Sequence, residues 1–485
     1  SALLGFYLEW DFNARKNKIM EALEHGEQAI TFLSTIGDTY ELARAYVKAA
    51  TYLQVHRYYF LELDEQKRHF QKATGYWLKA NEASEEAAMI ELLSTLGEPS
   101  LDWGDGTDET LMNFKKALEY GKKTRDQFIV GCALDWLAYH TSWKAFATED
   151  QDRRVELFKR ALQYAEDARH HYSPISFISP RGDTYWTQAP HAEHYFDLAR
   201  FETNLSKRRE LLEKAVEAAP ELLKRAENSG YPEAIINANH VFSLILWFLA
   251  KTETSSEEKK KLLEKALRHR NESIRLTKQL QPFAYWNRGI NQGVIARIKS
   301  ELAGLAKDPE TKKTMLQEAI LNYETAVKLC IKGLGFYEKE DSISLFAVLG
   351  IGQYEYGDLL SRLTDGREQL RKAIKIFEEA AESFQKPNMT SRVAECYWRI
   401  AQICEKLGEH LKAAENFELA SNNYKSSAEK IPQLRDFYMD YALYMQAWSE
   451  IELGKYHHEG KRYDEAKLHY EKSASLHKST EHWNY

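Results

Sequence analysis

Apolar residues recur every three or four positions along most of the chain, which is the spacing of amphipathic helices. One pattern keeps returning: an apolar residue or pair, one or two polar or charged residues, and an alanine that is usually followed by another apolar residue. The mean spacing between copies is about 49 residues, the range expected of a repeat protein. We therefore predict ten motif helices, with the alanine of each at Ala22, Ala73, Ala117, Ala161, Ala215, Ala266, Ala319, Ala373, Ala413 and Ala466.

Five of these helices carry a longer pattern, in which small, aromatic and small residues occupy positions i, i+4 and i+7. On a helix these positions form one stripe. The small residues let a neighbouring backbone approach closely, and the ring fills the space between them. The stripes are Ala73-Trp77-Ala80, Ala319-Tyr323-Ala326, Ala373-Phe377-Ala380, Ala413-Phe417-Ala420 and Ala466-Tyr470-Ser473.

A second set of helices, each about 20 residues long, is predicted between the motif helices from the same periodicity. Gly37, Gly230 and Gly408 stand where helices should end. Pro232 and Pro282 stand where helices should begin. The partner helices are expected at 39–60, 125–146, 184–203, 232–251, 283–305, 340–363, 390–407 and 433–455.

Residues 397–420 resemble the tetratricopeptide repeat (TPR), which pairs two antiparallel helices. The residues that carry the resemblance are Tyr397, Ile400, Ala401, Cys404, Gly408, Ala413, Phe417 and Ala420. A second copy has Leu453 and Gly454 on the first helix and Ala466 and Tyr470 on the second. The family repeats every 34 residues or so, and longer helices or loops must absorb the difference here.

The resemblance implies an all-α fold, an α-solenoid (superhelix) of about ten antiparallel helix pairs that are TPR-like. Residues 1–310 hold degenerate TPR-like repeats with a loop insert at 170–190, and residues 311–485 hold more regular TPR repeats. We expect one continuous array. Because the chain starts at Ser1 without Met and stops close to a predicted helix, we also expect it to be a fragment of a longer protein.

Composition supports this fold and narrows the function. The chain has 485 residues but only 23 Gly and 10 Pro, too few turn residues for a β-sandwich or barrel. The net charge is −7 and the sequence has no basic stripe, so we expect no nucleic-acid partner. The longest apolar run, residues 241–250, is too short to cross a membrane and predicts a buried helix. Accordingly, no membrane association is expected.

The cysteines are not spaced for metal binding or redox chemistry. Cys132, Cys330, Cys396 and Cys404 form no CxxC pair, and we expect them to be buried thiols. A reducing, cytoplasmic location follows from that interpretation.

No catalytic motif is found, and we expect no cofactor and no metal. Gly454–Lys461 has the wrong glycine spacing for a phosphate-binding loop. His191 and His194 supply two ligands where a zinc site needs three or four. Gly350, Gly352 and Gly357 are expected to be close-packing points between helices.

Four clusters of polar and aromatic residues on the partner helices are candidates for ligand binding, because amide, guanidinium and exposed ring groups suit peptide or small polar ligands. By the resemblance, the first helix of each pair lines the concave groove, which places Trp398 and Gln402 there. A neutral surface is the alternative for each cluster. The candidates are Trp186, His191, Asn239, His240, Trp286, Arg288, Asn291, Trp398 and Gln402.

We therefore predict a non-catalytic scaffold that binds a protein, a peptide or a small polar effector. It would serve as the sensor or docking arm of a larger signalling or defence protein, a step that rests on analogy. One alternative is a helical-toroid enzyme acting on a sugar or lipid, with the aromatic-rich insert 170–190 over its centre. Another is a structural scaffold that forms oligomers through the solenoid ends.

Overall fold

The computed structural model describes most of the chain. The described residues are 10–39, individual positions between 41 and 79, and then 108–125, 127–172, 192–202, 204–230, 232–335, 343–363 and 366–480. Most of the predicted insert 170–190 and of the predicted helix 39–60 lies outside these residues, as do Trp186 and His191.

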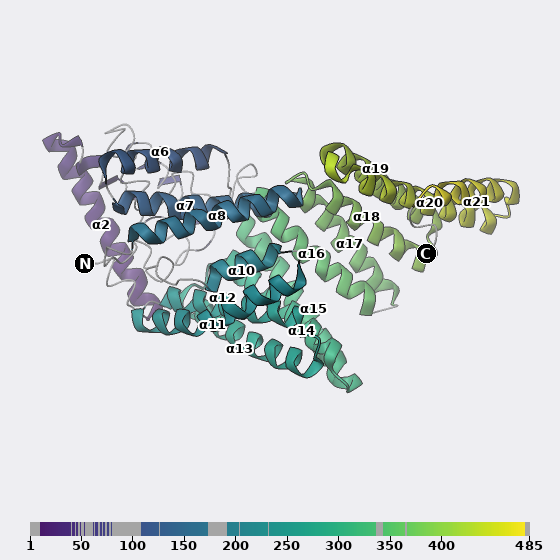
Figure 1. Ribbon diagram of the computed structural model, residues 1–485, viewed down its shortest axis with the longest axis horizontal. Helices are drawn as coiled ribbons and strands as arrows, with labels where there is room; N and C mark the ends of the chain where they lie inside the picture. The colour runs from purple at the N-terminus through teal and green to yellow at the C-terminus, as the bar shows by residue number, and fades with distance from the viewer. Residues whose placement is uncertain are drawn as a thin grey trace. The chain divides into compact units, whose positions relative to one another are not determined.

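Every regular element in the described part of the chain is helical (Figure 1). A short 3-10 turn, Pro432–Leu434, precedes α20. The α-helices are α2 (Phe12–Ile36), α6 (Asp108–Thr124), α7 (Gln127–Ala147), α8 (Gln151–Tyr172), α10 (Ala192–Phe201), α11 (Leu205–Ser229), α12 (Pro232–Thr252), α13 (Ser256–Leu280), α14 (Tyr285–Leu305), α15 (Pro309–Leu334), α16 (Ile343–Leu363), α17 (Arg367–Gln385), α18 (Thr390–Lys406), α19 (His410–Lys430), α20 (Arg435–Glu459) and α21 (Tyr463–Lys478).

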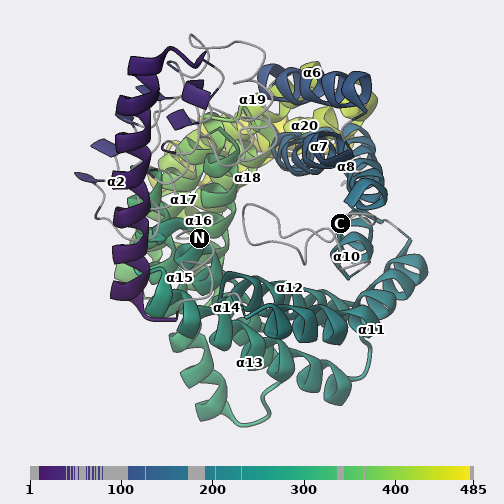
Figure 2. The ribbon, with the colours of Figure 1, turned by 90° about the vertical axis from the view of Figure 1, so that its left-hand side faces the viewer.

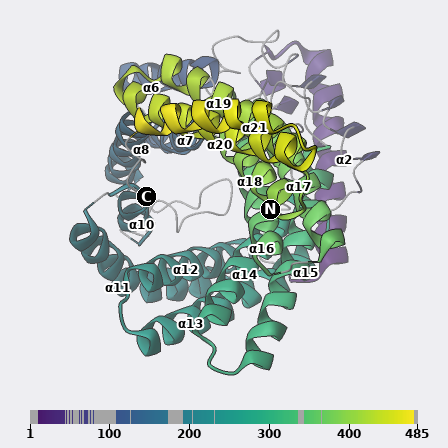
Figure 3. The ribbon, with the colours of Figure 1, turned by 90° about the vertical axis from the view of Figure 1, so that its right-hand side faces the viewer.

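Consecutive helices pack as pairs, each a partner helix followed by a motif helix. The seven pairs in the described residues are α7–α8, α10–α11, α12–α13, α14–α15, α16–α17, α18–α19 and α20–α21. Figure 2 shows the earlier pairs well and Figure 3 the later ones. The motif helices predicted around Ala22 and Ala117 are α2 and α6. The prediction of an all-α fold built from TPR-like helix pairs is confirmed.

The chain divides into two compact units, Ser1–Ser342 and Ile343–Tyr485, which we describe separately. The division falls between α15 and α16. Helix α15, grouped by the sequence with the regular repeats after residue 310, belongs to the first unit. The regularity of the repeat and the division into units are therefore different properties of the chain.

The small–aromatic–small stripes of α17 and α19 lie in the core of the second unit, whereas Tyr470 in the stripe of α21 is 37 % exposed. Phe377 and its flanking alanines are fully buried. Gly357 of α16 faces this ring so closely that a Cβ there would lie 3.1 Å from it. Gly350, two helical turns earlier on the same face, faces the ring of Phe384, from which a Cβ would lie 2.8 Å. The prediction of close packing is confirmed for these two glycines but is wrong for Gly352, which faces open space.

Helices end at the turn glycines that predicted their ends. Gly37, Gly230 and Gly408 have φ angles of 74°, 71° and 74°, the left-handed conformation that ends helices and favours glycine. At the opposite ends, the Asn204 and Asp308 side chains accept hydrogen bonds from backbone N–H groups three residues ahead. The predicted helices 232–251 and 283–305 agree with α12 and α14 to within two residues at each end.

The core of the first unit is built around α12. The segment Ala234–Thr252 of this helix is long and apolar enough to cross a membrane, and so extends beyond the ten-residue run noted in the sequence. In the structure 61 % of its most apolar window is buried. Its Ile245, Leu246 and Ala250 pack in the core of the unit, which is how the central helix of a repeat array behaves.

Three of the four cysteines have described side chains, and all three are buried free thiols, as predicted. Burial raises the pKa of Cys330 to about 12 and that of Cys404 to about 11. At neutral pH both are therefore protonated and pack as small apolar groups.

Candidate binding face on α12 and α14

The structure brings together three of the predicted site residues from two successive helix pairs. Asn239 and His240 lie on α12, and Asn291 lies on α14. Trp286 and Arg288 are also on α14, whereas Trp398 and Gln402 belong to α18 in the second unit. Trp186 and His191 lie outside the described residues, so the cluster predicted around them is not placed.

Trp286 does not line a groove. It is 6 % exposed, and a Cβ on Gly333 of α15 would lie 2.8 Å from its backbone nitrogen. The absence of a side chain at Gly333 lets α15 approach α14 at this point, and the indole is buried in the resulting contact. The prediction of an exposed ring at Trp286 is corrected by this arrangement.

Arg288 is partly buried beside this contact. Its guanidinium donates to the backbone carbonyl of Pro282, at the turn that precedes α14. Its Nε atom is buried and has no hydrogen-bond partner among the described residues. Arg288 thus holds the start of α14, and its Nε–H donor has no partner among the described residues.

Trp398 and Gln402 lie on one face of α18, as the spacing predicts. The Trp398 ring is half-buried and contacts two rings of α20, with centroid distances of 6.2 Å to Tyr441 and 6.5 Å to Tyr444. Gln402 accepts a hydrogen bond of 3.1 Å from Arg399. Both residues therefore have partners within the second unit.

The decisive residue of the first unit is Arg270 of α13, which the sequence did not single out. It is 0 % exposed. Its Nη1 donates to Oδ1 of Asn291 at 2.5 Å and lies against Nδ1 of His240. Its Nη2 donates to the backbone carbonyl of His240 at 3.0 Å, and its Nε to Oγ of Ser243 at 3.3 Å. One guanidinium thus links α12, α13 and α14.

Arg270 occupies the aromatic position of the repeat. Ala266, Arg270 and Ser273 stand at i, i+4 and i+7, and all three are fully buried. In the α17 stripe the same middle position is Phe377. This substitution is the sequence signal for the site, because a charged residue in the middle of a small–aromatic–small stripe must enter the core.

None of the side chains that bind Arg270 is a carboxylate in the described part of the chain. Burial lowers the pKa of Arg270 to about 9, and the charge of Arg297 contributes to the shift. The guanidinium stays protonated at neutral pH. A buried cation with neutral partners is costly, since burial of an ion is normally offset by an opposite charge.

His240 is held as a neutral ring beside this cation. Burial, and after it the charge of Arg270, lower the pKa of His240 to about 3, although the hydrogen bond with Asn291 raises this pKa. Nδ1 of His240 faces two groups, the guanidinium of Arg270 and, at 2.9 Å, Oδ1 of Asn291.

Asn239 contacts both α12 and α13 beside the network of Arg270. It is buried, and its amide nitrogen donates to the backbone carbonyl of Ile235 at 2.9 Å. Its Oδ1 lies 2.9 Å from Nδ1 of His269 on α13. Asn239 therefore ties α12 to α13 and does not face a ligand.

Two further amides next to the network keep unpaired atoms. Nδ2 of Asn237 and Oε1 of Gln292 are buried and have no hydrogen-bond partner among the described residues. Asn237 precedes His240 by one turn of α12, and Gln292 follows Arg288 by one turn of α14. Each unpaired buried polar atom costs about 1–3 kcal/mol unless a ligand or water satisfies it.

The second unit contains buried charges of the opposite sign, and these are fully paired. Glu452 accepts from His410 at 2.7 Å and Lys455 at 2.6 Å. Glu450 accepts from His469 at 2.7 Å and Lys472 at 2.5 Å. Burial alone would raise the pKa of Glu450, but the hydrogen bonds from His469 and Lys472 outweigh it and hold the pKa below its ordinary value.

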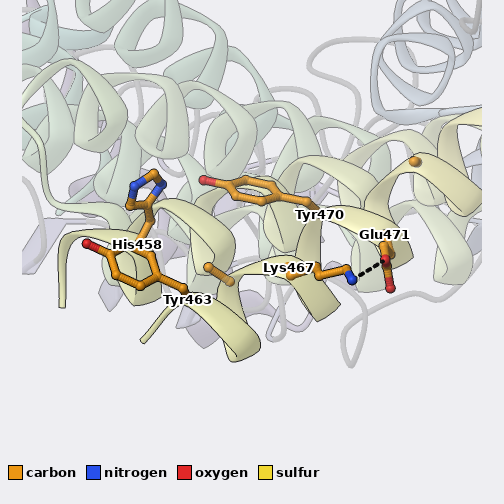
Figure 4. Close-up of a pocket in the computed structure, with 7 residues that line it drawn as sticks. His458, Tyr463, Lys467, Tyr470 and Glu471 are labelled. Atoms are coloured by element: carbon orange, nitrogen blue, oxygen red, sulfur yellow. Dashed lines mark ion pairs between the residues drawn. The ribbon is translucent and has the colours of Figure 1, made fainter. Parts of the chain in front are cut away.

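A hollow of about 430 Å³ lies on the last described helix pair (Figure 4). Its floor is apolar, and the rings of Tyr463 and His458 meet at its edge with centroids 5.3 Å apart. Lys467 and Glu471 form an ion pair of 3.8 Å on the same helix. Such a shallow, apolar hollow suits a protein contact better than chemistry.

Residues 352–475 match the family model of the soluble NSF attachment protein, SNAP. The match covers less than half of the chain and lies within the second unit, where the stripes are regular. The described helix pairs are tetratricopeptide-like. No curated protein matches the chain.

Solved structures with similar helices show low similarity. BtubC from P. vanneervenii is 18 % identical, with 57 % of this chain and 91 % of that chain covered and a TM-score of 0.34. Aspartyl phosphate phosphatase F from Bacillus subtilis is 12 % identical, with 94 % and 93 % covered and a TM-score of 0.30. Yeast Tom70 is 15 % identical, with 96 % and 88 % covered and a TM-score of 0.25. TM-scores in this range carry no argument about function.

Proposed function

We propose that this chain is a non-catalytic scaffold that binds a polypeptide partner, and that the face of α12 and α14 around His240 is a binding site. The observation that carries the proposal is the fully buried Arg270. Its charge is bound only by neutral groups, yet it holds His240 and Asn291 in place from two successive repeats. An aromatic residue at this position would fill the core at a lower cost in free energy. Polar groups that are kept at such a cost are often found at functional sites.

The unpaired atoms beside the network indicate the chemistry of the ligand. Nδ2 of Asn237 can donate, and Oε1 of Gln292 can accept. A polypeptide backbone offers the complementary carbonyl and N–H groups. Because Arg270 fixes the ring of His240, a ligand that binds here loses little free energy to ordering the protein side chains.

A double substitution, Asn237→Ala with Gln292→Ala, tests the site. Neither truncated atom has a partner in the described residues, so the helices should keep their stability. Peptides would be selected from a displayed library on the full chain, and their affinities measured by fluorescence anisotropy. We expect at least tenfold weaker binding by the double variant.

The matched control is Lys260→Ala with Glu264→Ala, which removes an exposed ion pair of 3.9 Å on α13. It should leave affinity within twofold of the unmodified chain. If the library yields no binder, or if the two double variants bind equally well, the face of α12 and α14 is not the binding site.

The finer role follows from analogy with other repeat scaffolds. The chain would act as the sensor or docking arm of a larger signalling or defence protein, with a small polar effector as another possible occupant of the same face. A cytoplasmic location is part of the proposal and is supported by the buried thiols of Cys330, Cys396 and Cys404. Detection of the native protein by fractionation of its source cells would test the location.

Self-association through the end of the array is a second candidate. The observation in its favour is the apolar hollow on α21, beside which Tyr463 and Leu468 are 60 % and 64 % exposed. The toroidal enzyme, the third alternative from the sequence, has no observation in its favour among the described residues.

A further inference from the structure

Helices α6, α7 and α8 enclose a second pocket, distant in sequence from the face of α12 and α14. Its volume is about 210 Å³, below the range of roughly 300–1,000 Å³ that is typical of sites for drug-sized ligands. Leu137 and Leu157 form part of its wall. Helix α7 packs against both α6 and α8, so the pocket is built by the fold and not by a loop (Figure 2).

Four cationic side chains line this small space. Lys115 comes from α6, Lys144 from α7, and Arg153 and Arg160 from α8. No carboxylate is among the lining residues. Like charges gathered beside an apolar wall repel one another, and a bound anion would relieve that repulsion.

The two arginines share one exposed acid as an ion-pair partner. Glu156 accepts from Arg153 at 2.6 Å and from Arg160 at 2.9 Å, and it does not itself line the pocket. Each guanidinium keeps further N–H donors that Glu156 does not use. Lys115 has no ion pair or hydrogen bond to its side chain within the part of the chain that the structure describes. The lining of the pocket therefore includes N–H donors that Glu156 does not bind.

A neutral polar side chain lies among the lining residues. Thr141 lines the pocket and is only 2 % exposed. Its hydroxyl can donate one hydrogen bond to an anion. The phenol of Tyr164, also in the lining, adds a second hydroxyl.

We propose that this pocket binds a phosphate group, either as free phosphate or as the phosphate monoester of a side chain. Guanidinium groups match phosphate oxygens with paired hydrogen bonds, and lysine adds a point charge. The volume of about 210 Å³ is sufficient for one such group. The Thr141 hydroxyl would donate the neutral hydrogen bond that completes the shell of oxygen contacts.

The test is isothermal titration of the full chain with inorganic phosphate at constant ionic strength. The variant Lys115→Ala with Arg160→Ala removes two lining charges, one from α6 and one from α8. Its control, Lys116→Ala with Lys159→Ala, removes the adjacent exposed charges from the same two helices. We expect at least a tenfold loss of affinity in the first pair and less than twofold in the control.

Equal losses in both double variants would mean that binding depends on general surface charge, and the proposal would be wrong. It would be equally wrong if the unmodified chain gave no saturable heat with phosphate. Circular dichroism melting of each variant checks that affinity is compared between folded proteins.

Thr141→Val tests the site without a change of charge or of shape. We expect a three- to tenfold weaker affinity for phosphate and an unchanged melting curve. An unchanged affinity would show that Thr141 does not bind the phosphate. The source of the phosphate is distinguished by a phosphoserine peptide and its unphosphorylated form. A phosphopeptide that binds tighter than inorganic phosphate supports a phosphorylated side chain, and equal affinities support the free ion.

Discussion

Nδ1 of His240 lies 2.9 Å from Oδ1 of Asn291, although 51 residues separate the two in the chain. That separation is one repeat, so the contact joins equivalent first helices of successive pairs. Arg270, on the intervening second helix, donates to Asn291 and lies against His240. In the neighbouring repeats an apolar stripe holds successive pairs together, whereas here a hydrogen-bond network supplies part of that contact.

Replacement of Arg270 should therefore be among the most destabilising changes in the first unit. Arg270→Ala leaves a cavity and strips Asn291 and Ser243 of their donor, while it relieves a buried charge. We expect a net loss of about 3 kcal/mol in the free energy of unfolding, within the range for large buried side chains. Urea denaturation followed by circular dichroism measures it.

Two further variants show what causes the loss of stability in Arg270→Ala. Arg268→Ala removes an exposed arginine from the same helix and should change stability by no more than about 0.5 kcal/mol. Arg270→Phe restores the aromatic residue of the repeat and should be less destabilising than Arg270→Ala. If Arg270→Phe proves the worse of the two, the position is not an aromatic site of the stripe.

His240 should make the stability of the first unit depend on pH. Its pKa is about 3 in the folded chain and about 6.5 when unfolded, so the unfolded state binds the proton more readily. The stabilising contribution is present above pH 6.5 and is lost progressively as the pH falls toward 3. Between pH 7 and pH 5 the loss should approach about 2 kcal/mol.

His240→Gln cannot take up this proton and isolates the effect. The unfolding free energy of the variant should fall less between pH 7 and pH 5 than that of the unmodified chain. His269, whose pKa is also lowered by burial, is present in both proteins and cancels in the difference. Parallel pH profiles would show that His240 is solvated and not buried against Arg270.

Much of the fold could be predicted because its signals are local. The periodicity of apolar residues and the turn glycines placed α12 within one residue of its observed bounds, Pro232–Thr252. The site could be predicted only in part. Asn239, His240 and Asn291 were found as polar residues on partner helices, but the connection between them depends on Arg270.

Arg270 was missed because α13 is rich in charge and looks solvated when its residues are counted together. Only the register of the stripe, Ala266–Arg270–Ser273, shows that this one charge is turned inward. The burial of Trp286 was missed for a related reason, since it depends on Gly333, which lies 47 positions further along the chain on α15. Contacts between successive repeats cannot be read from one helix at a time.

Two glycines of α16 should respond to substitution in opposite directions. A Cβ at Gly350 would lie 2.8 Å from the ring of Phe384, so Gly350→Val should destabilise the second unit by about 1–3 kcal/mol. Gly352 faces open space, and Gly352→Ala should stabilise it by about 0.5–1 kcal/mol, because alanine favours the helix. Thermal unfolding of both variants tests the packing, and a stabilised Gly350→Val would contradict it.

Self-association through α21 predicts a dependence on two exposed side chains. Tyr463 and Leu468 are 60 % and 64 % exposed, and Tyr463 borders the apolar hollow of about 430 Å³. If a second copy covers this face, Tyr463→Glu with Leu468→Glu places charge in an apolar contact and should shift the protein to monomer in sedimentation velocity. Leu419→Glu, on an exposed position of α19, is the control and should leave the distribution unchanged. A chain that is monomeric before substitution, at concentrations up to about 100 μM, would rule out this interface, since a stable one saturates well below that range.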